Sequence, residues 1–276
     1  MQKIYTEVLP SNELRQFVDC YWVLSADGPG GQEDHRVIPD LCNDIIFDVG
    51  RSAFPSFGGS SAQVVGAMTR PNCSSIVPGI KLCGIRFKPL GAAAVPGIPV
   101  GELKDLQIDL CDLGLNGFNL RDALAEIGDS QKQIQYVDSF LKRRMHIFTA
   151  IDQRLCAAIE ITAKAAGRVS IDSLSRTLNL SRRHLSRMFS DQTGLSPKEF
   201  CRIVRVRNAL QQIRLLSCRP DWSNLALEYG YFDQAHFIND FRSVVGISPH
   251  QYWANETTLG EGSLAPLPDQ MAPAAS

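Results

Sequence analysis

The chain has 276 residues, of which 44% are hydrophobic and 21% are charged, a composition typical of a globular protein with a substantial core. No apolar run approaches the roughly 20 residues that cross a bilayer, and the first ten residues lack the apolar segment of an export signal. We therefore expect a cytoplasmic location and no membrane partner. The eight cysteines include no C-x-x-C pair, which argues against a zinc site, so no metal or cofactor is expected.

The net charge of −1 hides an uneven distribution along the chain. Residues 1–150 carry 14 basic and 17 acidic side chains, whereas residues 151–255 carry 14 basic and 9 acidic ones. A basic segment indicates an anionic partner. Twelve of the fourteen basic residues in that segment are arginines, whose planar guanidinium suits phosphates and base edges.

The first 115 residues predict a β-rich region. Short runs of β-favouring residues are separated by Gly, Pro, Ser and Asn, which are typical of turns. These runs lie at 18–24, 43–49, 62–68 and 80–89. The segment 1–118 is therefore interpreted as a β-rich domain.

A helical segment is expected at 119–148. One helix would begin at the cap residue Asn119, and a second would begin at Ser130. The second helix places apolar side chains along one face, namely Ile134, Val137, Phe140, Leu141 and Met145. This face would either cover the β-domain or pair with a second subunit, so the segment is a candidate for dimerisation as well as a linker.

Residues 149–254 predict helices throughout, with interruptions at Gly167, Gly194, Pro220, Gly230 and Gly246. Residues 255–276 are rich in Pro, Gly, Ala and Ser and are expected to be a disordered tail. The predicted fold class is α+β with two domains, a β-rich N-terminal domain with flanking helices and an all-α C-terminal domain.

The helical region contains one unit twice. When Leu180 is aligned with Phe232 the copies keep step for twenty residues, and upstream L-S-R-T-L-N matches L-A-L-E-Y-G with one residue inserted in the turn. Each copy is a short helix, a tight turn at Asn179 or Gly230, and a longer helix, because Asn and Gly tolerate the left-handed backbone of such a turn. Each copy then continues with a glycine and S-P-x-E or S-P-x-Q, a capping box with proline at the first helical position.

This pattern predicts two helix-turn-helix motifs, in which the second helix of each motif enters the major groove of DNA. The outward faces of the two longer helices supply the candidate contacts, although a plain solvated surface is the alternative. The candidates are Arg182, Arg183, Ser186, Arg187 and Ser190 in the first helix and Gln234, Ala235, Ile238, Asn239 and Arg242 in the second. Arg183 or Arg187 is suited to guanine and Asn239 to adenine, whereas Ile238 is suited to a thymine methyl group.

A long helix is expected between the motifs, at 196–216. Five apolar residues keep helical spacing there, namely Phe200, Ile203, Val206, Leu210 and Ile213. At 1.5 Å per residue the helix would be roughly 30 Å long, close to the ~34 Å of one DNA turn. A rigid spacer of this length would let one chain enter two successive major grooves, at two half-sites of different sequence.

The stretch G-Y-F-D-Q-A-H-F-I-N-D-F-R-S-V-V-G-I-S-P-H-Q-Y, together with the paired motifs and the linking helix, resembles the DNA-binding domain of the AraC/XylS family of bacterial transcription regulators. The resemblance covers residues 151–253. It implies sequence-specific binding to double-stranded promoter DNA, usually to activate transcription with RNA polymerase. It also implies a homodimer and a small-molecule effector or another signal for the second domain. The family usually has a basic residue where Asn239 stands, and often lysine at Ser190 and Arg242, so the first motif is expected to contribute more affinity.

The motifs L-R-Q-F-V-D-C-Y-W, R-V-I-P-D-L-C-N-D-I-I-F-D and G-I-R-F-K-P-L-G resemble an uncharacterised β-rich domain that is often joined to AraC-type domains. No ligand follows from this resemblance. The polar residues tied to the motifs could either line a ligand pocket or form an internal salt-bridge framework. They are Arg36, Asp40, Asp44, Arg86 and Lys88.

Other function classes find less support in the sequence. No motif of a common hydrolase, nucleotide-binding enzyme or metalloprotease is present, so an enzyme is not expected. A redox-responsive regulator using Cys42, Cys73 or Cys83 is one alternative. A DNA-alkylation-repair enzyme is another, but it would need a zinc-held cysteine cluster that the spacing does not supply. A non-specific architectural DNA protein is the third, and it would have no preferred sequence.

Overall fold

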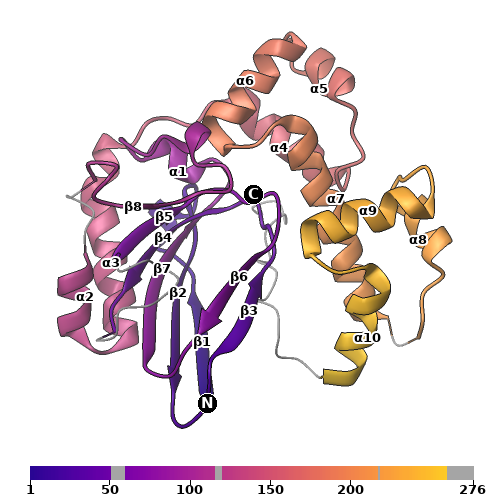
Figure 1. The fold of residues 1–276 in the computed structure, drawn as a ribbon. Helices are drawn as coiled ribbons and strands as arrows, with labels where there is room; N and C mark the ends of the chain where they lie inside the picture. Colours follow the sequence, from indigo (N-terminus) through magenta and orange to yellow (C-terminus); the bar gives the residue numbers. More distant parts are fainter. Residues whose placement is uncertain (51–59, 116–119, 217, 260–276) are drawn as a thin grey trace.

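The computed structural model describes residues 1–50, 60–115, 120–216 and 218–259, and it divides into a β-rich N-terminal part and a helical C-terminal part (Figure 1). The predicted α+β class with two domains is confirmed. The N-terminal part is built on a six-stranded sheet in which all neighbouring strands are antiparallel. The strand order is β1 (Gln2–Val8), β2 (Val18–Asp27), β7 (Ile80–Phe87), β4 (Asn43–Asp48), β5 (Ala62–Val65) and β8 (Gln107–Asp109).

Four strands agree with the sequence prediction and four do not. The expected runs correspond to β2, β4, β5 and β7, which form the buried middle of the sheet. Strands β1 and β8 were not predicted, nor was the separate hairpin of β3 (Glu33–Val37) and β6 (Asn72–Ile76). These four strands lie at edges, and Ile76 is the only one of their residues that is buried, so they lack the buried apolar run by which a central strand is recognised.

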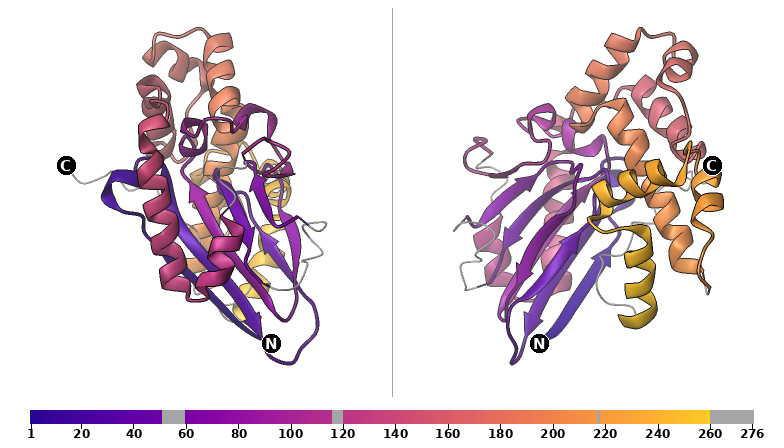
Figure 2. Two further views of the ribbon diagram at one scale, coloured as in Figure 1. Left: turned by 90° about the vertical axis from the view of Figure 1, so that its left-hand side faces the viewer. Right: turned by 45° about the vertical axis from the view of Figure 1, so that its right-hand side comes forward.

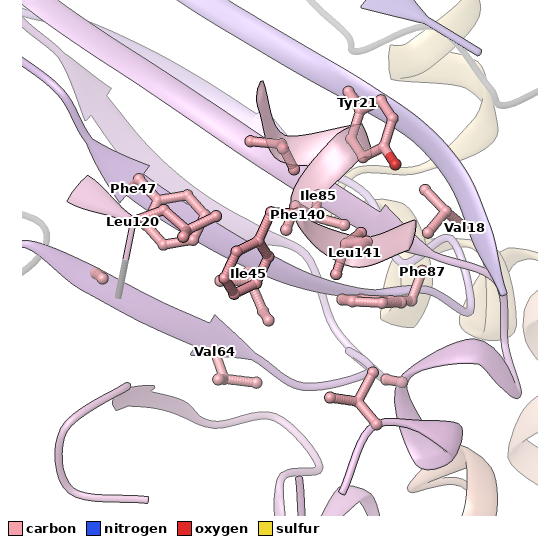
Figure 3. Packing of buried hydrophobic residues seen from close by; sticks show 14 of the residues in the cluster. Val18, Tyr21, Ile45, Phe47, Val64, Ile85, Phe87, Leu120, Phe140 and Leu141 are labelled. Carbon is pink, nitrogen blue, oxygen red and sulfur yellow. The ribbon is translucent and has the colours of Figure 1, made fainter. Parts of the chain in front are cut away.

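Two helices cover one face of the sheet, α2 (Arg121–Ile127) and α3 (Ser130–Arg144) (Figure 1). Figure 3 shows Phe140 and Leu141 of α3 packed over Ile45, Ile85 and Phe87 of the sheet. The predicted apolar face of the second helix is thus buried against the chain's own sheet, and the choice left open by the sequence is settled in favour of covering the β-domain. The expected cap residue Asn119 lies outside the described residues.

The C-terminal part is a chain of seven helices within the described residues (Figure 2). They are α4 (Gln153–Lys164), α5 (Ile171–Thr177), α6 (Arg182–Thr193), α7 (Pro197–Leu215), α8 (Trp222–Glu228), α9 (Gln234–Val245) and α10 (Pro249–Leu259). One continuous core joins them, with Phe189, Phe200, Phe237 and Phe241 fully buried. The tail was expected to begin at 255, but α10 continues to Leu259, and the rest of the tail lies outside the described residues.

The two domains contact each other along α6 and α7. Two short elements of the N-terminal domain, α1 (Gly91–Ala94) and the 3-10 turn η3 (Val100–Glu102), pack against the end of α6. The approach is close, because a Cβ atom on Gly101 would lie 3.2 Å from the Cα atom of Asp191. Arg207 of α7 also donates a hydrogen bond of 2.5 Å to the carbonyl oxygen of Asp40. The N-terminal domain therefore contacts the first half of the helical domain, and Pro71 and Arg36 also approach Gly246 in the second half.

Candidate nucleic-acid interface

Both helix-turn-helix units turn through the same backbone geometry. Asn179 and Gly230 have φ angles of 51° and 74°, the left-handed conformation that the sequence predicts at these positions. In the first unit the amide of Leu180 donates to the carbonyl oxygen of Ser175, and in the second the amide of Tyr231 donates to that of Ala226, each at 2.9 Å. These are the hydrogen bonds of one C-terminal capping motif used twice.

The same hydrogen bonds locate the inserted residue of the second unit. They make Tyr231 the counterpart of Leu180, whereas the sequence alignment paired Leu180 with Phe232. Phe232 is the extra residue, and its side chain is 89% exposed. The residues after the turn align equally well whether Tyr231 or Phe232 is taken as the inserted residue. Only the hydrogen bonds of the turn distinguish the two.

The longer helix of each unit is fixed at both ends by equivalent residues. Ser181 caps α6 by accepting from the His184 amide, and Asp233 caps α9 by accepting from the His236 amide. Gly194 and Gly246 end the two helices in the left-handed conformation. The expected capping boxes then follow.

In the first capping box Ser196 and Glu199 exchange side-chain-to-backbone hydrogen bonds. In the second, Ser248 and Gln251 do the same. A glutamine therefore closes the second box as a glutamate closes the first, and the two scaffolds are the same at this level of detail.

The first long helix presents a basic outer face. Arg183, Ser186 and Arg187 are exposed, while the opposite side of α6 is buried in the core. The His184 ring nitrogen Nδ1 lies 3.2 Å from Arg187 Nη2. This contact is made within α6, and the Arg187 side chain remains on the exposed face of the helix. Arg182 is paired with Asp172 of α5 and helps to hold the two helices of the motif together.

The fifth candidate of α6, Ser190, is half-buried near the N-terminal domain. Its carbonyl oxygen would lie 3.2 Å from a Cβ atom on Gly101. The exposed basic surface of α6 is therefore concentrated in its first two turns.

The second long helix presents a less charged face. Ala235, Asn239 and Arg242 are exposed, but Gln234 accepts a hydrogen bond of 3.0 Å from the Ser223 hydroxyl of α8. Ile238, expected on the outward face, is half-buried and packs against the core of the domain, so a contact of this side chain with a thymine methyl group stays a prediction. Its hydrophobicity is explained by this packing, because a half-buried position on the edge of a helix is stabilised by an apolar residue.

The linking helix has the predicted length and packing. Its 19 residues correspond to roughly 29 Å. The five apolar residues named for 196–216 are all at most 1% exposed. Arg205 lies over the Tyr231 ring at 4.9 Å, and Arg214 donates to the Tyr252 hydroxyl at 2.6 Å. Together with Arg207, which holds the Asp40 carbonyl, these arginines make contacts inside the protein, so α7 is a buried strut between the two motifs.

Three of the five candidate ligand residues of the N-terminal domain come together around one guanidinium. Arg86 Nε lies 3.5 Å from a carboxylate oxygen of Asp40 and 3.6 Å from one of Asp44, and its Nη1 lies 2.9 Å from Glu7. The other two are placed differently: Arg36 lies beside Gly246 of the helical domain, and Lys88 lies at the end of β7. The arrangement is that of an internal salt-bridge framework, and a ligand site at these residues stays a prediction.

Sequence reasoning missed Asp19, which belongs to the same cluster. It is 2% exposed, and among the described residues neither of its carboxylate oxygens has a hydrogen-bond partner. Burial raises the pKa of Asp19 to about 7, although the positive charge of Arg86 opposes the shift. The register of β2 against β7 shifts between Val18 and Cys20, at the position of Asp19, and no pattern in the sequence predicts this shift.

The cysteines named for a redox switch differ in exposure. Cys42 and Cys83 are buried, and burial raises the pKa of both thiols, that of Cys83 to about 12. A thiol that stays protonated reacts slowly with oxidants, so the redox alternative is not favoured at these two positions. Cys73 is exposed on β6.

Two family models match the chain. Residues 6–109 match a domain of unknown function, DUF6597, and residues 174–255 match a helix-turn-helix domain. The C-terminal domain is an AraC-type helix-turn-helix domain. The resemblance carried by residues 230–252 is thereby confirmed, and the β-rich N-terminal domain is the uncharacterised one that accompanies it.

Similar proteins are regulators of transcription. An HTH-type transcriptional regulator of Haemophilus influenzae is 32% identical over 107 residues, covering 38% of this chain and 35% of that protein. The regulator MtrA of Neisseria gonorrhoeae is 33% identical over 103 residues, covering 37% and 33%. The transcriptional activator AarP of Providencia stuartii is 26% identical over 97 residues, covering 35% and 70%. The chain thus spans about a third of the length of the first two relatives.

Solved structures of the same type are also similar. The C-terminal domain of the response regulator AraT from Geobacillus stearothermophilus aligns with a TM-score of 0.37 at 23% identity, covering 41% of this chain and 94% of that one. Fatty-acid-bound ToxT from Vibrio cholerae aligns with a TM-score of 0.40 at 15% identity, covering 80% and 94%. At these identities the likeness concerns the fold alone.

Two further features concern the described residues alone. No group of three or more His, Cys, Asp and Glu side chains within them is arranged to hold a metal ion. None of the helices in the described part of the chain combines the length and apolarity needed to span a bilayer.

Proposed function

We propose that this protein is a sequence-specific DNA-binding regulator of transcription that inserts α6 and α9 into successive major grooves at a promoter. The observation that supports the proposal most directly is that one largely buried helix, α7, joins two helix-turn-helix motifs with equivalent scaffolds. The length of α7 is roughly 29 Å, and successive major grooves on one side of the duplex lie ~34 Å apart. The protein acts through binding and not catalysis, in the cytoplasm.

The first unit supplies most of the affinity in this proposal. Arg183 and Arg187 project from the first two turns of α6, where recognition helices contact base edges, and a guanidinium matches the two acceptors of guanine. Arg182 is held by Asp172 at the helix start and is placed for a phosphate. Ser186 lies on the same face as the two outer arginines and completes the reading surface.

The second unit reads a different half-site. Asn239 is exposed on α9 and offers the bidentate contact that suits adenine, while Arg242 lies one turn further along the same face. Ala235 is small enough to admit a thymine methyl group, a contact that Ile238 makes less well because it is half-buried. The unequal faces of α6 and α9 support an asymmetric site over the two identical half-sites of a palindrome.

Further features of the proposal rest on family relationships. The activator AarP shares the helical domain, which supports positive regulation through contact with RNA polymerase. The protein acts as a homodimer, and its N-terminal domain responds to a small-molecule effector. Since the apolar face of α3 is buried on the sheet, the dimer interface lies elsewhere than on that face.

Selection from a pool of random duplexes with the full-length protein tests the proposal. The expected product is a site with two different half-sites centred about 10 base pairs apart. Inserting 5 base pairs between the half-sites turns the second groove to the far side of the duplex. Inserting 10 restores the side but doubles the distance. Because α7 is a rigid buried helix, both insertions should weaken binding to the level of a single half-site. Selection of no common sequence would instead indicate an architectural DNA protein.

A further inference from the structure

One arginine beside the first helix-turn-helix unit reaches the turn of the second. Arg168 lies in the turn between α4 and α5, and its Nη1 donates a hydrogen bond of 3.0 Å to the carbonyl oxygen of Glu228, the last residue of α8. The methylene groups of the same side chain pack on Gly230, because a Cβ atom there would lie 3.1 Å from both Cγ and Cδ of Arg168. Together these two interactions form the inter-unit contact.

The main chain next to Arg168 is fixed on α7. Gly167 precedes it with a φ angle of 75°, and a Cβ atom on this glycine would lie 2.4 Å from the carbonyl oxygen of Cys201 and 2.9 Å from the amide nitrogen of Arg205. The turn therefore meets α7 main chain to main chain. The Nε atom of Arg168 also donates to the carbonyl oxygen of Ala165 at 3.3 Å. The guanidinium thus extends to the second unit from a rigid base.

The turn of the second unit is held from α7 as well. The guanidinium of Arg205 lies over the ring of Tyr231, 4.9 Å from its centre, and a cation in this place is attracted by the electrons of the ring. Tyr231 directly follows Gly230, on which Arg168 packs. Two arginines from different elements therefore contact neighbouring residues of one turn, which restricts how the second unit can rotate about α7.

The inter-unit contact explains a difference between the two turns. Asn179 and Gly230 both have left-handed φ angles, and the backbone alone would accept asparagine at either position. At 230, however, a side chain would need the space that Arg168 fills. The second turn therefore has a glycine because of its neighbour, and not only because of its own conformation.

From this geometry we infer that Arg168 is a positioning residue, which fixes the rotation of the second unit about α7 and so selects the spacing between the two DNA half-sites. The role in spacing rests on the proposed function. One base pair more or fewer between the half-sites rotates the second by about 35° and moves it by about 3.4 Å. A unit held by α7 and by Arg168 cannot follow this rotation, whereas a unit without the inter-unit contact follows it more readily.

Two substitutions break the inter-unit contact from opposite sides. Arg168→Met keeps an unbranched side chain over Gly230 but removes the hydrogen-bond donor. Gly230→Asn keeps the left-handed turn, as Asn179 does in the first unit, and its side chain should displace Arg168. The double variant should behave like either single variant, since both remove one contact. Arg176→Met is the matched control, because this exposed arginine donates to the carbonyl oxygen of Asp172 within α5.

Distances between two spin labels in the full-length protein without DNA test whether the second unit is fixed. Labels on unnatural amino acids at Thr177 of α5 and Asn224 of α8, both exposed positions, leave the eight cysteines unmodified. We expect one narrow distance distribution in the wild-type protein and in Arg176→Met. The distribution should be broader in Arg168→Met and in Gly230→Asn. Equal widths in all four proteins would overturn the inference.

Binding to the selected DNA site tests the consequence for spacing. Fluorescence anisotropy compares duplexes with the selected spacing and duplexes whose half-sites are one base pair closer or farther apart. We expect the ratio of these affinities to fall about three- to ten-fold in Arg168→Met and in Gly230→Asn, and to stay unchanged in Arg176→Met. The preferred bases within each half-site should not change, because the exposed sides of α6 and α9 are the same in all variants.

Other roles of Arg168 give different results. A phosphate contact would weaken binding by one factor at every spacing and lower the salt slope by about one. A purely stabilising role would lower the midpoint of unfolding and leave the ratio of affinities unchanged. Either result would overturn the inference, whereas recovery of the ratio in Arg168→Lys, which keeps a donor, would support it. Selection of no common DNA sequence would contradict the proposed function and with it the role in spacing, while the spin-label distances would still decide whether Arg168 fixes the second unit.

Discussion

The first helix-turn-helix unit, α5–α6, and the second, α8–α9, have the same turn and the same helix ends. They differ in the exposed side of the longer helix. Both turn at a left-handed residue, both begin the long helix at a side-chain cap, and both end it at glycine. The face of α6 carries Arg183 and Arg187, whereas the corresponding part of α9 carries Ala235 and Asn239. A few residues therefore fix this scaffold, which leaves the exposed positions free to differ in what they recognise.

The units also differ in their attachment to the N-terminal domain. The first is packed against η3 at Gly101 and Val100, with Gly194 so close that a Cβ atom would lie 3.0 Å from the Val100 carbonyl oxygen. The second approaches the N-terminal domain at Gly246, next to Pro71 and Arg36. The first unit therefore meets the N-terminal domain at the main chain of η3, whereas the second meets side chains of that domain.

The largest expected effect is on the free energy of unfolding, and it shows whether the two scaffolds contribute equally to stability. Phe189 of α6 and Phe241 of α9 are both fully buried at matching positions. Phe189→Ala and Phe241→Ala should each lower the free energy of unfolding by about 3–5 kcal/mol, because a large cavity replaces the ring. Urea unfolding of both variants measures this, with Gln211→Ala on the exposed side of α7 as the control. A cost for one phenylalanine near that of the control would show that the units are not equivalent.

Substitutions on the exposed sides of α6 and α9 should affect different half-sites of the DNA, although the two scaffolds are alike. Arg187→Ala should cost about 1–3 kcal/mol at one base pair of the first half-site and relax its specificity, and Asn239→Ala should do so at one base pair of the second. Arg182→Ala is the matched control, since this arginine is paired with Asp172 and is placed for a phosphate. It should weaken binding to all sequences alike.

Fluorescence anisotropy with single-base variants of the selected site distinguishes these outcomes. The dependence of affinity on salt adds a second measure, because each lost phosphate contact lowers the slope by about one. If Arg187→Ala weakened binding uniformly and lowered the salt slope, then Arg187 would be a phosphate contact, and base recognition in the first unit would rest on Arg183 and Ser186.

The caps at the start of the two long helices should give a smaller effect of equal size. Ser181→Ala and Asp233→Ala each remove the oxygen that accepts from the third residue of the helix, so each should cost about 0.5–2 kcal/mol of stability. Thermal unfolding of the two variants provides the measurement, and Ser181→Asp should retain the cap. A loss confined to one unit would mean that its helix is held by packing alone.

The sequence predicted the parts of this comparison that depend on neighbouring residues. The turn at Asn179 or Gly230 and the S-P-x-E and S-P-x-Q boxes are local patterns with a direct physical cause, and the structure has them as expected. The buried middle strands of the sheet were predicted for the same reason, since each carries its own apolar run.

What the sequence could not predict depends on contacts between distant segments. The packing of Gly101 on α6 joins residues ninety positions apart, and no local pattern marks it. Phe232 could not be identified as the inserted residue until the turn's hydrogen bonds were known. The half-burial of Ile238 was not predicted, because a position on the edge of a helical face is half-buried or exposed according to what packs beside it.

The smallest expected effect concerns the attachment of the first unit, and the second unit supplies the means to measure it. Glu199 has two roles, because one carboxylate oxygen closes the capping box with Ser196 and the other meets Lys104 at 3.2 Å. Gln251 closes the equivalent box in the second unit, so Glu199→Gln should keep the box and remove only the ion pair. A double-mutant cycle of Lys104→Ala with Glu199→Gln should give a coupling energy of about 0.2–1 kcal/mol, as for other partly exposed pairs, and ~1 M salt should reduce it. A coupling above about 2 kcal/mol would mean that the ion pair, and not the packing of Gly101, holds the first recognition helix to the N-terminal domain.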